Sequence, residues 1–241
     1  MISSGQDREA RLAELTANLA AVRARIDAAC ADAGRSAASV RLIAITKTFP
    51  ATDVMLLHQL GIADFGENRD QDAAPKAAEC SAAGLRLHWH FVGQLQVNKA
   101  ASVASYAYMV HSVDRVRLVD ALGRRAVAAG RQLRCLVQVS LDGQAARGGA
   151  EPGEVPRLAD AIAERDGLEM AGVMAVAPLG QPARPAYARL REIAETVRSA
   201  HPGARVISAG MSGDLGEAIA EGATHVRIGT ALLGGRRAFV R

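Results

Sequence analysis

The sequence predicts an α/β fold, a closed (β/α)8 TIM barrel preceded by one additional N-terminal helix. Three observations predict it. Short apolar, β-branched runs alternate eight times with Ala-rich helical stretches from residue 40 onward. The chain has 241 residues, a length that α/β barrels often occupy as one domain. No Gly-x-Gly-x-x-Gly motif follows the first run, so the fingerprint of an open dinucleotide-binding sheet is missing.

Residues 7–33 are predicted to form one long helix. Its apolar positions step by three and four residues along a single stripe that ends near Gly34. They are Leu12, Leu15, Leu19, Val22 and Ile26. Two heptads of this pattern are too few for a coiled coil, so we expect the stripe to pack on the protein's own body.

The barrel is predicted over residues 40–234. Strands are expected at 40–47, 64–68, 87–93, 109–114, 133–140, 168–176, 205–208 and 225–229. Helices are expected at 51–60, 70–82, 98–106, 115–129, 153–166, 183–200 and 214–221. Strands separated by helices run parallel with right-handed crossovers, and eight such units favour closure into a barrel. No linker or change of composition divides the chain, so residues 1–241 are expected to form a single domain.

Composition excludes several classes of protein. The net charge is only +4, and eight aromatic residues (one Trp, three Tyr and four Phe) are too few for nucleic-acid stacking platforms. The sequence contains no membrane span and begins with a polar segment rather than a signal peptide, so a cytoplasmic location is expected. The three cysteines are widely spaced in apolar surroundings and are expected to be buried free thiols.

Polar residues follow the predicted strands, at the barrel face where the active sites of this fold lie. Lys47 ends the first strand. Partial desolvation in the barrel mouth would favour the neutral amine and prepare it for Schiff-base chemistry with a carbonyl compound. The alternative is a lysine that only extends into solvent.

Two glycine-containing loops follow the last two strands, at 208–214 and 227–234. In this fold the loops after strands 7 and 8 form a recurrent phosphate site, built from backbone N–H groups, hydroxyls and the start of a short helix. The alternative is that these glycines only make turns and that Ser212 caps the next helix. An aldehyde-binding lysine beside a phosphate site points to pyridoxal 5′-phosphate (PLP).

Arg227 shares the inward alternation of Gly229 and is expected to face the pyridine nitrogen of such a ligand. An arginine there would keep that nitrogen unprotonated and make the ring a weaker electron sink than an acidic partner would. A salt bridge at the barrel rim is the alternative for this side chain.

The chain resembles the pyridoxal phosphate homeostasis proteins, single-domain relatives of the alanine racemase N-terminal barrel, over about 200 residues. The matching segments are AITKT (44–48), FGENR (65–69), WHFVGQLQVNK (89–99), GVM (172–174), GMS (210–212) and RIGTA (227–231). The chain departs from the usual family pattern at Ala209 and Leu233, where smaller side chains stand near the cofactor loops.

The resemblance implies a function and a set of site residues. Lys47 is implied to be the Schiff-base lysine, with phosphate held by Ser212, Gly229 and Thr230. The complete candidate set for cofactor binding is Lys47, Asn68, Ser208, Met211, Ser212, Arg227, Gly229 and Thr230. For Asn68, a packed structural role is the alternative. The implied protein is a monomer without catalytic residues that holds PLP for intracellular homeostasis and delivers it to PLP-dependent apo-enzymes.

Two competing functions are weaker. A PLP-dependent amino-acid racemase needs a second acid/base, and Tyr106, Tyr108 and Tyr187 fall at the wrong end of the barrel or in a helix. Only eleven residues follow Thr230, too few for the second domain of alanine racemase. A metal site on His88 and His90 lacks a second histidine pair, so no metal is expected. Neither nucleic acid nor a membrane is an expected partner.

Overall fold

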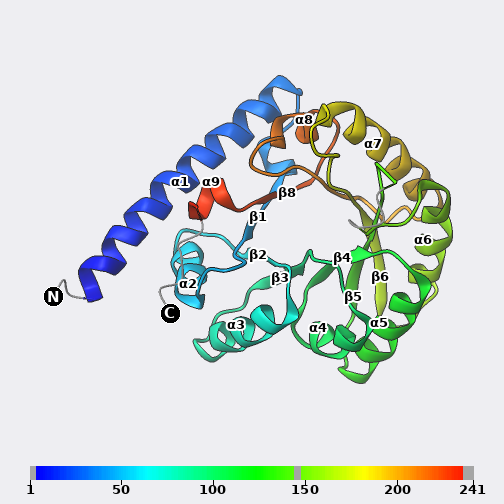
Figure 1. Ribbon diagram of the computed structural model, residues 1–241, viewed down its shortest axis with the longest axis horizontal. Helices are drawn as coiled ribbons and strands as arrows, with labels where there is room; N and C mark the ends of the chain where they lie inside the picture. Colours follow the sequence, from blue (N-terminus) through cyan, green and yellow to red (C-terminus); the bar gives the residue numbers. More distant parts are fainter. Residues whose placement is uncertain (1–3, 144–147, 236–241) are drawn as a thin grey trace.

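The computed structural model describes residues 4–143 and 148–235. Within these residues, eight parallel strands pair in chain order, and β8 pairs with β1 to close the barrel (Figure 1). The strands are β1 (Arg41–Ile45), β2 (Asp64–Glu67), β3 (His88–Phe91), β4 (Met109–Val113), β5 (Leu133–Gln138), β6 (Leu168–Met174), β7 (Val206–Ser208) and β8 (His225–Ile228). The predicted (β/α)8 barrel is confirmed.

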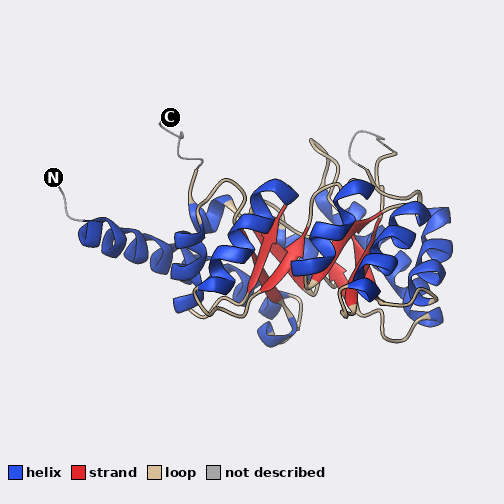
Figure 2. Ribbon diagram, turned by 90° about the horizontal axis from the view of Figure 1, so that it is seen from below, coloured by secondary structure: helices blue, strands red, loops and turns tan. Residues whose placement is uncertain are grey.

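Helices form the outer layer of the barrel (Figures 1 and 2). They are α1 (Ser4–Asp32), α2 (Ala51–Gln59), α3 (Asp70–Ala82), α4 (Ala100–Tyr106), α5 (Val116–Ala128), α6 (Val155–Ala163), α7 (Ala183–Ala200), α8 (Leu215–Ala220) and α9 (Thr230–Leu233). Short 3-10 turns are η1 (Ala37–Ser39), η2 (Val97–Lys99) and η4 (Pro152–Glu154). The helices α2 to α8 each connect two parallel neighbouring strands, and α9 follows β8, the last strand.

The helix α1 is the predicted N-terminal addition. Its residues Leu15, Leu19, Val22 and Ile26 are buried, and the helix contacts α8, α9 and α2. The expected packing of this stripe on the protein's own body is therefore confirmed. The first turns of α1 extend beyond the barrel in Figures 1 and 2, and residues 5–10 are exposed there.

Several strands are shorter than predicted, mostly at their carboxyl ends. The segment predicted over 40–47 pairs only as Arg41–Ile45, and that predicted over 133–140 pairs as Leu133–Gln138. Sequence patterning locates such ends only within a few residues.

The barrel interior is divided into an apolar half and a polar half. One cluster of apolar side chains inside the ring consists of Met109, Leu136, Ala171, Met174 and Val206. Polar side chains from β3, β4, β7 and β8 are buried beside it, namely His90, His111, Ser208, His225 and Arg227. Two larger apolar clusters lie between strands and helices, and they include the three cysteines, which are buried free thiols as expected.

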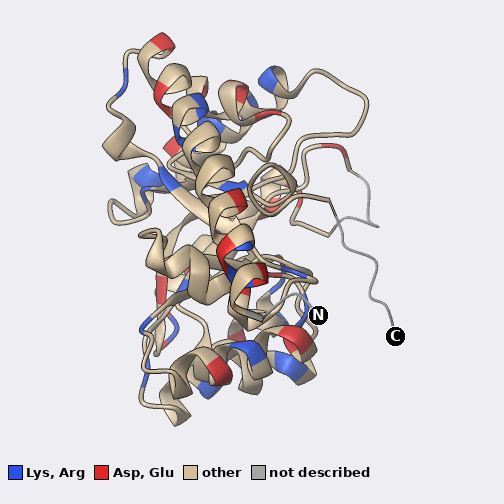
Figure 3. Cartoon of the chain, turned by 90° about the vertical axis from the view of Figure 1, so that its left-hand side faces the viewer, with Lys and Arg blue, Asp and Glu red and all other residues tan. Residues whose placement is uncertain are grey.

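The outer surface carries both signs of charge. Figure 3 shows Lys and Arg interspersed with Asp and Glu along the helices on one side of the molecule. Among the described residues, no helix combines the length and the apolar character needed to cross a membrane.

Candidate functional site

A cavity of about 440 Å³ opens at the carboxyl ends of the strands, within the range of roughly 300–1,000 Å³ that is usual for small-molecule sites. Its walls come from loops after β1, β2, β3, β6, β7 and β8. The lining residues are Ile45, Lys47, Asn68, Val92, Gly93, Met174, Val176, Met211, Ser212, Gly213, Arg227, Gly229 and Thr230. The structure thus brings together every predicted site residue except Ser208, which lies just beneath and contacts Arg227.

Lys47 lies in the turn that follows β1, two residues beyond the strand. Its side chain is exposed at the rim of the cavity. The desolvation expected from the sequence is therefore absent from this structure. The next residue, Thr48, has a left-handed backbone with φ of 69°, which is uncommon for a β-branched residue.

A buried ionic cluster holds the backbone next to Lys47. The Lys76 ammonium on α3 donates to the Thr46 carbonyl at 2.8 Å and pairs with the Glu67 carboxylate. Thr46 Oγ1 also donates to Glu67 Oε1 at 2.7 Å. Burial raises the pKa of Glu67, and the Lys76 charge opposes that shift. Sequence reasoning missed the role of Lys76, although a lysine on the inward side of a predicted helix was a usable signal.

The two predicted phosphate loops lie side by side. Ser212 Oγ accepts a hydrogen bond of 3.3 Å from the Ala231 N–H, which joins the loop after β7 to the start of α9. The first turn of α8 has no side-chain cap, so Ser212 does not act as the alternative interpretation supposed. Gly210 has φ of 88°, and a Cβ there would lie 2.7 Å from the Ala218 Cβ. Glycine is therefore required at this bend.

Asp214 fixes the shape of the loop after β7. Its Oδ1 accepts from the Met211 N–H at 2.6 Å, and its Oδ2 accepts from the Tyr187 hydroxyl at 2.7 Å. Arg25 on α1 donates to the Ser212 carbonyl at 2.7 Å. These contacts come from α1 and α7, which are far apart in sequence, so they could not be read from the loop motif itself.

Arg227 occupies the floor of the cavity and is 5% exposed. Its Nη1 donates to Ser208 Oγ at 2.7 Å and its Nη2 donates to the Ala175 carbonyl at 2.9 Å. It forms no ion pair within residues 4–143 and 148–235, so the rim salt bridge that was the alternative is not present. Burial lowers the pKa of this guanidinium from its ordinary value, against the opposing influence of Tyr187 and Asp214. A side chain of this type stays protonated in proteins.

The remaining predicted residues lie on the walls of the cavity. Asn68 is partly exposed beside Gly93, where a Cβ would lie 2.1 Å from the Asn68 carbonyl oxygen. Met211 is 37% exposed at the entrance. The alternative metal site is not formed: His88 and His90 both face Asp64, and no described group of three ligating side chains is arranged around a metal position.

The donor set of the cavity fits PLP. An amine stands at the rim, hydroxyl and glycine loops lie beside it, and a guanidinium lies on the floor. Apolar side chains such as Ile45, Val92 and Met174 supply walls for an aromatic ring.

The comparisons with known proteins agree with this geometry. Residues 13–237 match the model of the alanine racemase N-terminal domain family. A pyridoxal phosphate homeostasis protein of Mycobacterium tuberculosis is 47% identical over 253 residues, with 98% of this chain and 97% of the relative covered. The chain belongs to the pyridoxal phosphate homeostasis protein family. The resemblance seen in the sequence is therefore confirmed, over nearly the full length of this family member.

Two solved structures with a similar fold are a PLP-bound relative and an alanine racemase. PipY of Synechococcus elongatus, solved with PLP bound, has a TM-score of 0.78 and 33% identity, covering 91% of this chain and all (100%) of PipY. Alanine racemase of Streptomyces coelicolor has a TM-score of 0.70 and 21% identity, with 92% of this chain but 58% of the racemase covered. The second comparison supports the fold alone.

Proposed function

We propose that this chain binds PLP as a Schiff base to Lys47 and serves to store and deliver the cofactor, without a catalytic role of its own. The observation that carries the proposal is the convergence of one lysine, one buried arginine and two hydroxyl-bearing loops on a single cavity. The family name and the PLP-bound structure of PipY support it.

Lysine content makes the assignment of the amine specific. The sequence contains three lysines, at positions 47, 76 and 99. Lys76 is buried in its ion pair with Glu67, and Lys99 lies outside the cavity within 3.9 Å of Asp70. Lys47 alone lines the cavity, so it is the lysine that an aldehyde there would meet.

The other site residues are assigned by position. Ser212, Gly229 and Thr230 would hold the phosphate group, and Arg227 on the floor would face the pyridine nitrogen. Asn68 and Met211 line the sides, while Ser208 acts through Arg227. When bound, PLP supplies a carbonyl for amines and a conjugated ring that accepts electrons.

The positions of the three tyrosines support storage over racemisation. Tyr106 bonds to Asp70, Tyr108 stacks on His88, and Tyr187 bonds to Asp214 beneath the loop after β7. All three lie in the described part of the chain and none lines the cavity. None of the three tyrosines is therefore placed to act in this cavity as the second acid/base that a racemase needs.

We place the protein in the cytoplasm as a single-domain monomer that supplies PLP-dependent apo-enzymes.

The decisive experiment combines PLP titration with chemical trapping. We expect the purified chain to show a visible absorption band with PLP, and borohydride reduction followed by peptide mapping to label Lys47. Lys47→Ala should lose the covalent label, whereas Lys99→Ala, as the matched control, should retain it. A label on Lys76 or Lys99 would make the site assignment wrong. Efficient alanine or serine racemisation that disappears in Lys47→Ala would support the racemase instead.

A further inference from the structure

A continuous chain of hydrogen bonds crosses the barrel interior and ends at Arg227. Asp64 Oδ1 lies 2.9 Å from His90 Nε2, and His90 Nδ1 lies 2.9 Å from His111 Nε2. His111 Nδ1 lies 2.9 Å from Ser208 Oγ, which accepts from Arg227 at 2.7 Å. The five side chains come from β2, β3, β4, β7 and β8. The chain thus connects the amino ends of the strands to the cavity at their carboxyl ends.

Burial of these polar side chains costs folding free energy unless each of them forms hydrogen bonds. His90, His111 and Ser208 are each no more than 1% exposed, and bulky apolar residues usually fill this part of a (β/α)8 barrel. An unpaired polar group in such a place is strongly unfavourable, whereas a fully bonded network becomes rigid. The apolar cluster around Leu136 shows that the other half of this interior is filled in the usual way.

The two ends of the chain determine its direction. A guanidinium can only donate, so Ser208 Oγ is the acceptor for Arg227. An ionised carboxylate can only accept, so His90 Nε2 carries the proton that faces Asp64. Desolvation opposes ionisation of Asp64, but the hydrogen bond from His90 and the positive charge of Arg41 favour the carboxylate, and the net effect lowers the pKa of Asp64.

The inner bonds then have one consistent arrangement. Neutral His90 with a proton on Nε2 accepts at Nδ1, so His111 donates from Nε2. His111 in turn accepts at Nδ1, and the Ser208 hydroxyl donates to it. Burial lowers the pKa of both imidazoles, which agrees with two neutral rings. Every donor along the chain therefore points from Arg227 toward Asp64.

We infer that Asp64, His90 and His111 are positioning residues for the cofactor site, because they hold the Ser208 hydroxyl in the orientation that makes it an acceptor for Arg227. This inference rests on the proposed function for its effect on PLP. With Nη1 on Ser208 and Nη2 on the Ala175 carbonyl, the guanidinium is fixed in one plane at the cavity floor.

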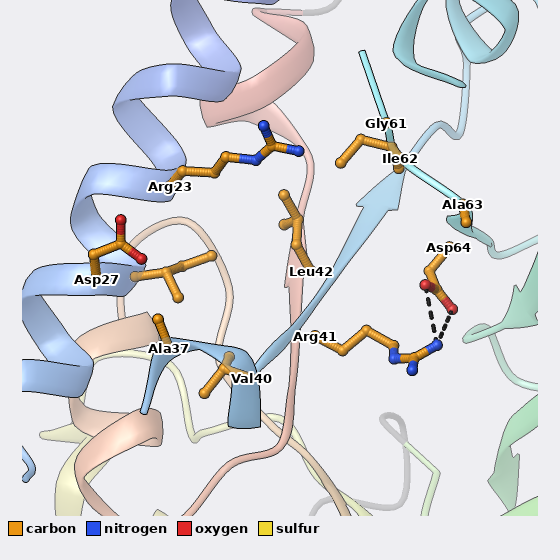
Figure 4. Close-up of a pocket in the computed structure, with 11 residues that line it drawn as sticks. Arg23, Asp27, Ala37, Val40, Arg41, Leu42, Gly61, Ile62, Ala63 and Asp64 are labelled. Carbon is orange, nitrogen blue, oxygen red and sulfur yellow. Dashed lines mark hydrogen bonds and ion pairs between the residues drawn. The ribbon is translucent and has the colours of Figure 1, made fainter. Parts of the chain in front are cut away.

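The lower end of the chain is anchored at the opposite face of the barrel. Figure 4 shows a second cavity, of about 340 Å³, in which Arg41 extends to the Asp64 carboxylate. Arg41 Nη1 lies 3.3 Å from both carboxylate oxygens, and His88 Nδ1 also lies 3.3 Å from Oδ1. These contacts stabilise the charged carboxylate that sets the direction of the chain.

The first test needs no cofactor. In the apo protein with ¹⁵N-labelled histidine at neutral pH, NMR should show His90 and His111 both as neutral rings protonated at Nε2. Resonances are assigned from His90→Gln and His111→Gln. A ring protonated at Nδ1, or an imidazolium, at either position would overturn the inference even if PLP binds normally.

The second test compares two substitutions at one buried position. His111→Gln can still accept from Ser208 and donate to His90, whereas His111→Phe can do neither. We expect His111→Phe to bind PLP about tenfold more weakly and to shift the visible absorption maximum, as for loss of one hydrogen bond to a charged group. His111→Gln should remain near the parent.

A buried histidine that is not part of this chain of hydrogen bonds provides the matched control. His225 bonds to Thr224 Oγ1 and lies in the same interior, 6.3 Å from the His90 ring. His225→Phe should leave PLP affinity and absorption unchanged, even if stability falls. Unchanged PLP binding in a folded His111→Phe would refute the inference while leaving the proposed function intact. If the parent itself does not bind PLP, the proposed function fails and the tautomers measured by NMR decide the inference alone.

Discussion

At the scale of single residues, the site depends on a few short contacts between two loops. Ser212 links the loops through the Ala231 N–H, and Thr230 begins α9 with its side chain exposed to the cavity. The hydroxyls of Ser212 and Thr230 are available to a ligand at the same point. Neither side chain belongs to the apolar core, but removal of the Ser212 hydroxyl also breaks its hydrogen bond with the Ala231 N–H.

Removing either hydroxyl is expected to weaken PLP retention. Thr230→Val or Ser212→Ala should cost roughly 1–3 kcal/mol of binding free energy, the range for losing a hydrogen bond to a charged group. Equilibrium titration of PLP by absorbance or fluorescence measures this. Thr16→Val is a matched control, since Thr16 Oγ1 donates to the Leu12 carbonyl on α1 and does not line the cavity. Equal affinity of Thr230→Val and the parent would remove Thr230 from the site.

At the scale of elements, the close approach of β6 to β7 depends on one glycine. Gly172 has φ of 147°, and a Cβ there would lie 1.9 Å from the Val206 carbonyl oxygen. That oxygen belongs to the backbone and cannot move without breaking the pairing of Gly172 with Val206. β7 ends in Ser208, so this pairing also sets the height of the hydroxyl that holds Arg227.

Two glycine-to-alanine substitutions should therefore have opposite effects. Gly172→Ala should destabilise the fold by about 3 kcal/mol or more, because backbone must shift to admit the methyl group. Gly216→Ala on α8 meets no atom within 4 Å and should be neutral or stabilise by up to about 1 kcal/mol through helix propensity. Urea unfolding measures both. A Gly172→Ala variant as stable as the parent would contradict the packing described here.

At the scale of the whole molecule, buried neutral histidines link stability to pH. Burial lowers the pKa of His225 to about 3, and the pKa values of His90 and His111 are also lowered by burial. Below the ordinary histidine pKa of about 6.5, the unfolded chain binds protons that the native state does not. Acidification therefore favours unfolding, and stability is lost as pH falls from about 6.5 toward 3.

The free energy of unfolding should decrease between pH 7.5 and 5.5. One unit below the ordinary value, His225 is expected to contribute a loss of about 1.4 kcal/mol, and the buried His90 and His111 act in the same direction. Urea denaturation at the two pH values measures the sum. His225→Gln should reduce this pH-dependent loss by about one histidine's share, although its stability at pH 7.5 is lower. A free energy of unfolding that does not change over this range would show that these rings titrate as freely as in the unfolded chain.

Local patterns in the sequence are enough to predict the barrel and most of the residues that line its cavity. Alternating apolar runs and helical stretches are local patterns, and eight of them in one chain leave few topologies open. Lys47, Arg227 and the glycine loops could be placed at one face because the carboxyl ends of parallel strands meet there.

The surroundings of those residues depend on contacts between segments that lie far apart in the sequence. Lys47 is exposed in the turn after β1, and the backbone beside it is held by Lys76, which reaches it from a helix about thirty positions away. The chain of hydrogen bonds that links Asp64 to Arg227 joins five strands, and no spacing in the sequence specifies it. Strand register and barrel closure determine which inward side chains contact each other. These contacts therefore depend on the pairing of all eight strands together.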